Sequence, residues 1–491
     1  MKVLKLFIVI SWLSMLIVVL FFVRQGLTDN DVPTVVGEAV SARPLAVLEL
    51  PAHPFLAEPQ RSGMHGGSYN QDISAYPGPL GVNTVALHRE FSSLGGMAPN
   101  ITFDGKGRLI TVSVQFGRTE LLLLDPEKLE TLAMYRMPKT RSRDNSGGIY
   151  FHLDHKDRVI LAPNDNTIKI MEVVDDADGV HWKVLETYIL GGLFPDNARV
   201  HDVMPDWQGN LWFVTTENYI GYRDADTEKL YSVPLELGDE KIRNSLAIAQ
   251  DGVYVLSDHA LYRFEIDPET KEPRWSWREA YDEGSLRKPG MRGYGSGTTP
   301  TLVGNDLVAI VDAASPRAQI LVYKRLADHQ GERLICKEPI FKSGFSATEN
   351  SLMVYGNAMV VQNDYGRDVN DSALRTAPGI SRVDINDARD GCHTVWESQL
   401  RSQSLPRLSM ATGLIYLYTF SLPYPEAKTG GWYLTALDFK TGEELFSRLI
   451  GKGLGGNKDV LSGVSSPVVL GPNGAAYLGV RTGLVYVKDK P

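Results

Sequence analysis

The feature of this chain that most constrains its fold is a unit of about 40 to 50 residues that recurs along most of its length. Each unit has an apolar run that starts at a polar or small residue, a D-G or N-G type turn, an aromatic-rich run, a charged turn and a last strand-like run. The eight first runs begin near APNITF, SGGIYF, ARVHDV, RNSLAI, TTPTLV, SATENS, SLPRLS and SSPVVL. Four short strands per unit at this period predict an all-β, eight-bladed β-propeller. Seven blades would result if RNSLAIAQ and its neighbour belonged to one enlarged blade.

The two ends of this repeat region complement each other. The last unit ends at GLVYVKDKP without a fourth strand, and the run NTVALHREF, Asn83 to Phe91, stands before the first unit. Pairing the two would remove the free edges and close a ring. We therefore expect the propeller to occupy residues 83–491.

An uncharged apolar stretch lies at the N-terminus. Residues 6–23, LFIVISWLSMLIVVLFFV, would span about 30 Å of hydrocarbon as a helix. A signal peptide is the alternative, but Arg24 follows directly instead of a small-residue cleavage site, so we favour a transmembrane helix that acts as an uncleaved signal-anchor. Lys2 and Lys5 precede the span, which predicts a cytoplasmic N-terminus (residues 1–5) and a periplasmic or extracellular propeller.

Residues 24–82 are rich in proline and glycine and have no sustained periodicity. This composition predicts a linker followed by an irregular segment packed on the ring. Within it, His65, Tyr69 and Asp72 lie on a loop that would either cap the channel or form part of a surface linker.

The charge of the chain argues against one class of partner. The formal net charge is −9, the pI is near 5.7, and Lys and Arg do not cluster. Nucleic-acid binders depend on clustered cations, so we expect no nucleic-acid partner.

The chain has two cysteines, Cys336 and Cys392. Both begin what look like corresponding outer strands of successive units, and an oxidising compartment would permit a disulfide between them. The alternative is two unrelated, half-buried thiols.

One stretch near the C-terminus carries a family resemblance. Ala436, Asp438, Thr441, Gly442 and Phe446 match the pattern A-x-D-x-x-T-G-x-x-x-W, with phenylalanine in place of tryptophan. The stretch resembles the blade-docking motif of the quinoprotein alcohol dehydrogenase-like propellers, which are PQQ-type proteins with eight blades. Weaker forms of the same PQQ-like repeat occur at 124–128 and 266–270.

The resemblance does not extend to the cofactor site. Dehydrogenases of that family have a vicinal cysteine pair stacked on pyrroloquinoline quinone (PQQ) and a catalytic aspartate beside calcium. This chain has no adjacent cysteines, so we expect no PQQ and rank a quinone-type oxidoreductase last.

The first residues of the inner strands would gather at one mouth of the central channel, where propeller ligands bind. They are Asn100, Asn145, His201, Asp202, Asn244, Thr298, Thr299, Glu349, Asn350, Arg407, Ser465 and Ser466. Carboxylate and amide oxygens suit Ca²⁺, so Glu349, Asn350, Asn244 and Asn100 are the predicted metal ligands, with Asp202 as a further candidate. The alternatives are a polar, water-filled channel and a Glu349 to Arg407 ion pair.

Two further groups of residues are candidates at the same mouth. His201 and Asp202 are the catalytic candidates, because the set resembles that of six-bladed calcium-dependent lactonases and arylesterases, in which a histidine can act as base. Asn363, Asp364 and Tyr365 follow an apolar strand and, with Arg407, are the candidates for ligand binding. A turn held by Asx hydrogen bonds is the other interpretation of Asn363 to Tyr365.

The sequence therefore predicts a membrane-anchored extracytoplasmic propeller that acts as a binding or scaffold module around a polar channel. The partner would be a protein or a small molecule at the mouth, in addition to the membrane. The alternative is a channel-mouth enzyme, a calcium-assisted hydrolase of the lactonase or esterase type, since a fold by itself does not determine function.

Overall fold

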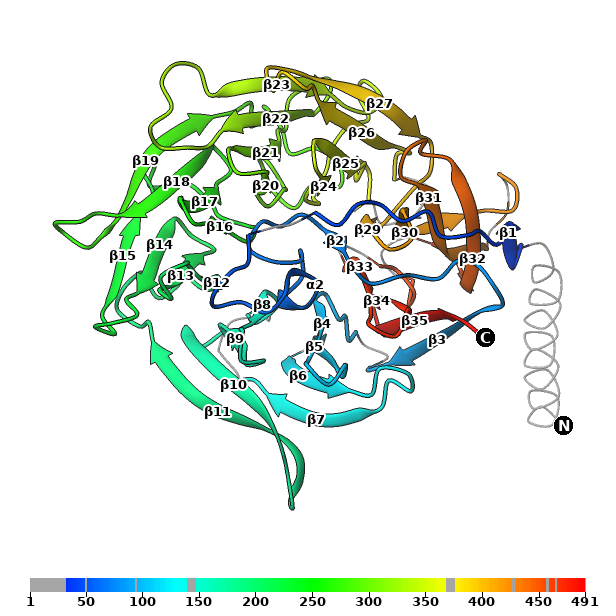
Figure 1. The fold of residues 1–491 in the computed structure, drawn as a ribbon, viewed down its shortest axis with the longest axis horizontal. Coiled ribbons are helices and arrows are strands. Elements are labelled where there is room, and N and C mark those ends of the chain that lie inside the picture. The colour runs from blue at the N-terminus through cyan, green and yellow to red at the C-terminus, as the bar shows by residue number, and fades with distance from the viewer. Residues whose placement is uncertain are drawn as a thin grey trace, which may run out of the picture.

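In the computed structural model, the described part of the chain comprises residues 32–48, 51–92, 95–115, 117–138, 147–367, 376–425, 427, 429–455, 459–463 and 466–490. These residues form eight sheets arranged in a ring, as Figure 1 shows. The eight-bladed β-propeller is confirmed, and the seven-bladed alternative is wrong because RNSLAIAQ begins a sheet of its own. No helix in the described part is long and apolar enough to cross a membrane, and the predicted anchor at 6–23 lies outside it.

The blades follow one another along the chain, each with its innermost strand first. Blades 1 to 4 contain β4 (Ile101–Phe103), β5 (Leu109–Gln115), β6 (Arg118–Leu124), β7 (Thr131–Arg136); β8 (Phe151–Leu153), β9 (Val159–Leu161), β10 (Thr167–Asp176), β11 (Gly179–Ile189); β12 (Val200–Pro205), β13 (Leu211–Thr215), β14 (Tyr219–Arg223), β15 (Leu230–Pro234); and β16 (Ala247–Ala249), β17 (Gly252–Leu256), β18 (Ala260–Ile266), β19 (Pro273–Ala280).

Blades 5 to 8 continue the ring. They contain β20 (Thr301–Val303), β21 (Leu307–Val311), β22 (Gln319–Lys324), β23 (Leu334–Pro339); β24 (Met353–Tyr355), β25 (Ala358–Gln362), β26 (Ile380–Ile385), β27 (Cys392–Ser398); β29 (Arg407–Ser409), β30 (Leu414–Ser421), β31 (Gly430–Asp438), β32 (Glu444–Gly453); and β33 (Ser466–Leu470), β34 (Ala476–Val480), β35 (Gly483–Asp489). The short strand β28 (Ser404–Leu405) pairs in parallel with β33.

The predicted closure of the ring is confirmed. Strand β3 (Thr84–Glu90) is the outer strand of blade 8 and pairs antiparallel with β35, from Thr84 opposite Asp489 to Glu90 opposite Gly483. The figure places the C-terminal end beside this strand (Figure 1). The ring is therefore joined by hydrogen bonds between its two ends, which leaves blade 8 without a missing strand.

The hydrophobic core is divided among the interfaces between blades. The described residues form eight apolar clusters, each built mainly from two neighbouring blades, and four of them also contain a residue of the chain before the ring, namely Leu56, Ala57, Tyr69 or Ile73. Inner strands such as β6 are covered on both faces and are buried almost throughout, whereas the outer strand β7 is half exposed. This arrangement explains why the inner strands read as unbroken apolar runs in the sequence.

The docking motif forms a tight turn that packs blade 7 on blade 6. Asp438 accepts backbone N–H bonds from Lys440 at 2.8 Å and Thr441 at 3.0 Å. Gly442 has φ +71°, and a Cβ there would lie 2.5 Å from the indole of Trp396 on β27. A side chain at position 442 would therefore clash with the neighbouring blade.

The same turn recurs in three other blades. Asp125, Asp224 and Asp267 each accept the N–H groups two and three residues further on. The two weaker repeats in the sequence mark real turns, and the turn at Asp224 was missed because its flanking residues depart from the pattern.

A disulfide joins the outer strands of blades 5 and 6. Cys336 on β23 and Cys392 on β27 are bonded, with 5.5 Å between their Cα atoms. The two blades are thus held together covalently at the circumference of the ring.

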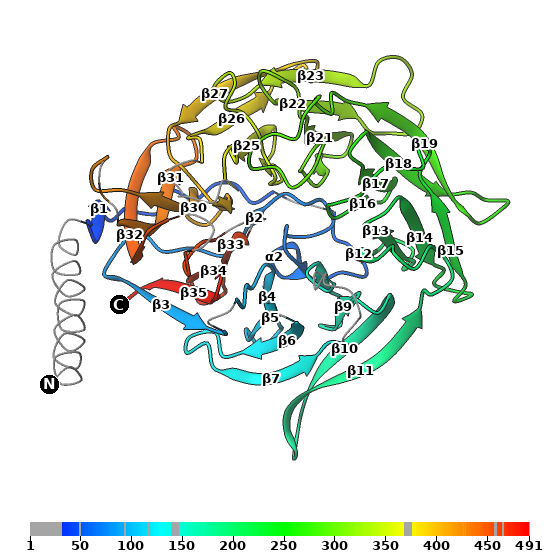
Figure 2. The same cartoon turned by 180° about the vertical axis from the view of Figure 1, so that it is seen from behind.

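The chain before the ring follows its surface and then crosses its centre. Strand β1 (Val35–Gly37) adds to the edge of β32. Residues 59–74, here called the channel segment, contain α2 (Pro59–Ser62) and β2 (Ile73–Ser74) and lie inside the ring in both views (Figures 1 and 2).

Candidate functional site

The channel segment is hydrogen-bonded to the innermost strands of four successive blades. Its carbonyl groups at 68, 69, 71 and 74 accept N–H bonds of 2.8 to 3.0 Å from Ile248, Leu302, Val354 and Met410. Strand β2 also pairs in parallel with β29. These contacts lie further along the inner strands than the predicted mouth residues, so the segment closes the channel at the end opposite the mouth.

A small cavity of about 100 Å³ remains at the mouth. Its walls come from the starts of inner strands and their preceding loops, and its floor comes from the channel segment. This mouth cavity is lined by Met64, His65, Met97, Pro99, Ile149, Tyr150, His201, Arg243, Asn244, Arg292, Thr299, Glu349, Asn350, Ser351 and Leu405.

The floor of the mouth cavity is fixed by a buried charge network. His65 Nδ1 lies 3.0 Å from Asp72 Oδ2, and Arg407 Nη2 lies 3.0 Å from Asp72 Oδ1. Arg407 also donates to the carbonyl oxygens of Met64 at 2.7 Å and Val468 at 3.1 Å. Arg407, predicted to bind a ligand, is thus engaged with the channel segment and is buried beneath the cavity.

A second histidine–carboxylate pair lies behind the wall of the mouth cavity. His152 Nε2 is 3.0 Å from Asp202 Oδ1, and the Ser245 hydroxyl donates to Asp202 Oδ2. Burial by itself would raise the pKa of Asp202, but the histidine and the hydroxyl outweigh it and hold that pKa below its usual range. Asp202 is fully buried, so its carboxylate serves this internal pair.

His201 and Asp202 are neighbours in sequence but occupy different surroundings. The register of β12 against β13 pairs Val200 with Thr215 and Asp202 with Val214, so His201 is the extra residue of a β-bulge. Its ring lies against Tyr150 with 4.9 Å between centroids and lines the mouth cavity. Bulges redirect side chains in this way, and burial raises the pKa of the Tyr150 hydroxyl to about 12.

Glu349 is the carboxylate of the mouth cavity. Its Oε1 accepts the backbone N–H of Arg292 at 2.6 Å, and its own N–H donates to Asp364 at 2.8 Å. Burial raises the pKa of Glu349, the Arg367 charge opposes that rise, and the charge of Asp364 adds to it. Glu349 therefore holds a proton to a higher pH than an ordinary glutamate.

The amide side chains at the strand starts donate hydrogen bonds, those of Asn100 and Asn244 to the next blade and that of Asn350 within its own blade. Asn100 Nδ2 donates to the carbonyl oxygens of Ile149 and Phe151, and Asn244 Nδ2 donates to that of Thr298. Asn350 Nδ2 donates to Asp364 at 3.1 Å. Since the nitrogens are used in this way, the amide oxygens are the atoms left for water, a cation or a ligand.

The structure brings three of the four predicted calcium ligands to one cavity. Glu349, Asn350 and Asn244 line it, whereas Asn100 is fully buried and does not. Within the described residues, no group of three or more histidines, cysteines and acids could hold a metal ion. The calcium site remains a prediction, and Glu349, Asn350 and Asn244 are the residues that could supply its oxygens.

The predicted ligand residues 363–365 brace loops near the mouth. Asn363 Nδ2 donates to the carbonyl oxygens of Phe345 and Pro378, and the ring of Tyr365 lies edge-on to Phe345 at 5.5 Å. Asp364 forms a fully buried ion pair with Arg367 at 2.9 Å. Asn145 and Ser465 lie outside the described residues.

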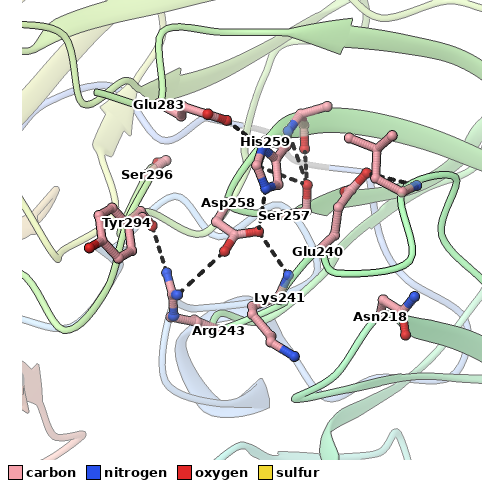
Figure 3. A network of polar contacts seen from close by, with 12 residues as sticks. Asn218, Glu240, Lys241, Arg243, Ser257, Asp258, His259, Glu283, Tyr294 and Ser296 are labelled. Carbon is pink, nitrogen blue, oxygen red and sulfur yellow. Dashed lines mark hydrogen bonds and ion pairs between the residues drawn. The ribbon is translucent and has the colours of Figure 1, made fainter. Parts of the chain in front are cut away.

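Hydrogen bonds and ion pairs connect loops of blades 4 and 5 beside the mouth cavity (Figure 3). Arg243 donates to the Tyr294 carbonyl oxygen at 2.6 Å, and its guanidinium lies 3.4 Å from Asp258. His259 pairs with Glu283 and lies 3.8 Å from Asp258. Arg243 is thereby fixed at the border of the mouth cavity by two acceptors, one on the turn between β17 and β18 and one on the connection between β19 and β20.

Sequence reasoning missed His152, Tyr150 and Arg292. Tyr150 and His152 flank the predicted start of an inner strand, SGGIYFHL, and that position could have identified them. Arg292 belongs to a glycine-rich loop, where no repeat pattern indicates which side chains face the channel.

Several solved structures are similar to this chain. The chain is similar to BamB from Moraxella catarrhalis, with 12% identity and a TM-score of 0.44 over 83% of this chain and 97% of that one. It is also similar to Sqt1 from Chaetomium thermophilum, with 10% identity and a TM-score of 0.49 over 81% and 95%, and to the C-terminal WD40 domain of Sif2, with 10% identity and a TM-score of 0.48 over 82% and 98%.

No family model matches the chain, and no curated protein matches it. At these identities and scores the similarities carry no argument about activity. The eight-bladed fold is established by the sheets of the chain itself, and the resemblance to quinoprotein propellers rests on the docking motif and the blade number.

Proposed function

We propose that the protein is a membrane-anchored, extracytoplasmic binding module that receives a polar group of a partner protein at the mouth of its propeller. The observation that supports this proposal is the closure of the channel by the channel segment. Residues 62–65 and 68–74 are buried, and their backbone is bonded to the inner strands. A closed channel is unsuited to passage of a substrate and leaves the mouth as the accessible end.

The size of the mouth cavity supports a partner protein over a small molecule at this place. Ligand pockets occupy about 300 to 1,000 Å³, whereas the mouth cavity has about 100 Å³. That volume admits one projecting polar side chain. Glu349 and the oxygens of Asn244 and Asn350 would accept hydrogen bonds from it, and Arg243 and Arg292 would contact the surface around it.

Site-specific photocrosslinking in the native membrane tests this function. A photoreactive residue at position 292 or 243, on the mouth, should yield a discrete crosslinked species. The matched positions 156 and 208, on turns at the closed end, should not yield that species. Crosslinks of equal yield from both ends, or from neither, would contradict the proposal.

The second candidate function is the calcium-assisted hydrolase. The observation that favours it is that Glu349, Asn350 and Asn244 share one cavity with His201, which could act as a base beside a metal-bound water. Elemental analysis of the purified full chain separates the two functions. Stoichiometric calcium that is lost in Glu349→Gln would favour the hydrolase, and a chain without bound calcium would favour the binding module.

A further inference from the structure

A second and larger cavity lies on the mouth face between blades 5 and 6, away from the channel. Its volume is about 790 Å³, within the range of small-molecule sites. Its walls come from the β21–β22 connection, the segment after β23, and the ends of β26 and β27 that face the mouth. This blade 5–6 cavity is lined by Arg317, Phe341, Lys342, Ser343, Phe345, Thr376, Ala377, Pro378, Gly379, Ser381, Glu397, Gln399 and Arg401.

The charge of this cavity is opposite to that of the whole chain. Three cationic side chains, Arg317, Lys342 and Arg401, face one carboxylate, Glu397. The chain as a whole carries a formal charge of −9. A local excess of cations in a partly enclosed site attracts an anion, because charges are less screened there than at an open surface.

Two of the cations are held in place by backbone carbonyl groups. Arg317 donates from Nη2 to Pro339 at 2.7 Å and from Nε to Ile340 at 3.3 Å, and Arg401 donates from Nε to Thr376 at 3.0 Å. These bonds leave Nη1 of Arg317 and both terminal nitrogens of Arg401 for a ligand. A guanidinium fixed in this way loses little freedom when it binds a carboxylate.

The cavity also contains an unpaired hydroxyl and two aromatic rings. Thr376 is 1% exposed, and among the described residues its Oγ1 has no hydrogen-bond partner. Phe341 is buried and Phe345 is 48% exposed, so the cavity offers an apolar surface beside its cations.

The two walls are fixed relative to each other. The disulfide between Cys336 and Cys392 joins the same two blades. Asn363 holds both Phe345 and Pro378, one on each side of the cavity. A site whose walls are held independently of the ligand binds with a smaller entropy cost.

From this geometry we infer that the blade 5–6 cavity binds a small organic acid, in which a carboxylate meets Arg317 and Arg401 and an aromatic or apolar body packs on Phe345. This site is separate from the proposed partner site at the mouth and does not depend on it. The carboxylate supplies the planar acceptor that the two guanidinium groups match.

Isothermal titration calorimetry with 4-phenylbutyrate tests the inference on the full chain in non-ionic detergent. The neutral 4-phenylbutyramide has the same apolar body and is the matched control ligand. The acid should bind with a Kd below about 1 mM and at least about tenfold more tightly than the amide, because charge-assisted bonds to arginine are the stronger ones.

Variants of cationic residues test whether the acid binds in the blade 5–6 cavity. Arg401→Gln should weaken binding of the acid about tenfold or more, and the exposed Lys342→Gln, which leaves the buried bonds intact, should weaken it by a smaller factor. Arg274→Gln, on the exposed side of β19 and paired with Glu265, should bind as the parent does. Equal binding of acid and amide, unchanged binding in both cavity variants, or no binding of the acid at about 10 mM would each overturn the inference.

Discussion

The two ends of the central channel differ in how their polar groups are used. The channel segment, which closes one end, is bonded to the inner strands of blades 4 to 7, and its one carboxylate, Asp72, is paired with both His65 and Arg407 beneath the mouth cavity. At the mouth, Glu349 lies in a cavity, partly buried, with its pKa raised by that burial. This difference is the basis of our proposal that the channel segment stabilises the ring and that the mouth provides polar groups for binding.

The largest expected effect on stability comes from removing the charge of the channel segment. Asp72→Asn keeps the size of the side chain and tolerates the positive φ of 54° at this position. It leaves the buried Arg407 without its counter-charge, which should lower the free energy of unfolding by about 3 to 5 kcal/mol. Denaturant unfolding measures this change in the free energy of unfolding. Asp175→Asn, in an exposed cluster with Lys106 and Arg108, is the control, and its loss should be far smaller because exposed ion pairs contribute little to stability.

Equal unfolding midpoints for Asp72→Asn and Asp175→Asn would show that the closed end does not stabilise the ring.

A smaller loss is expected from the hydrogen bonds of the channel segment. Asn70 Nδ2 donates to the carbonyl oxygens of Leu246 and Pro300, at 3.0 and 3.1 Å. Asn70→Gly accommodates the positive φ of 55° but leaves two buried acceptors unpaired, so we expect a loss of about 1 to 3 kcal/mol. The change is measured by thermal and denaturant unfolding.

Asn83→Gly is the matched control for that variant. Asn83 also has a positive φ, 45°, but it is exposed. Its replacement should leave stability unchanged or raise it slightly, by about 0.5 kcal/mol or less. A comparable loss in both variants would mean that the backbone conformation, and not the hydrogen bonding of the segment, accounts for the effect.

The smallest change in stability is expected from a variant at the mouth. This change is a gain, whereas the variants of the channel segment lose stability. The folded protein raises the pKa of Glu349 above the unfolded value, so between these two values the folded state binds more protons. Stability therefore falls as the pH rises through that window. Glu349→Gln cannot ionise and keeps an oxygen for the Arg292 N–H, so at pH 7 it should be more stable than the parent.

Thermal unfolding at two pH values checks that sign. The advantage of Glu349→Gln should be present near pH 7 and should disappear at a pH below the pKa of a free glutamate, about 4.3. A variant that is less stable than the parent at pH 7 would place Glu349 among the stabilising residues and remove the contrast between the two ends.

The sequence predicted the ring well because repeats are local and periodic. The blade number followed from the strand pattern, and Asn83 to Phe91 could be assigned to blade 8 because only that blade lacked a strand. The docking motif marked a turn in which Gly442 donates its N–H to the carbonyl oxygen of Asp438, four positions earlier. In each case the information lies within one unit or at its ends.

The interior of the channel could not be predicted, for physical reasons that the residues illustrate. The contact between Asp72 and Arg407 joins a segment without periodicity to blade 7. The partner of Asp202 is His152 instead of a mouth ligand, because a bulge at His201 changes which side chain faces the cavity. A bulge of one residue and a pairing between distant segments leave no mark in a pattern of alternating residues.

Hydrogen–deuterium exchange of the full chain tests most directly that one end of the channel is closed. The measurement compares a peptide covering residues 62–74 with the inner strands and with the exposed turn at 155–157. We predict that 62–74 exchanges as slowly as the inner strands, because its residues are buried, the N–H groups of Asn70 and Asp72 donate to the carbonyl oxygens of Gly67 and His65, and β2 pairs with β29. Exchange of 62–74 as fast as the turn would contradict the closed channel and the assignment of the mouth as the binding end.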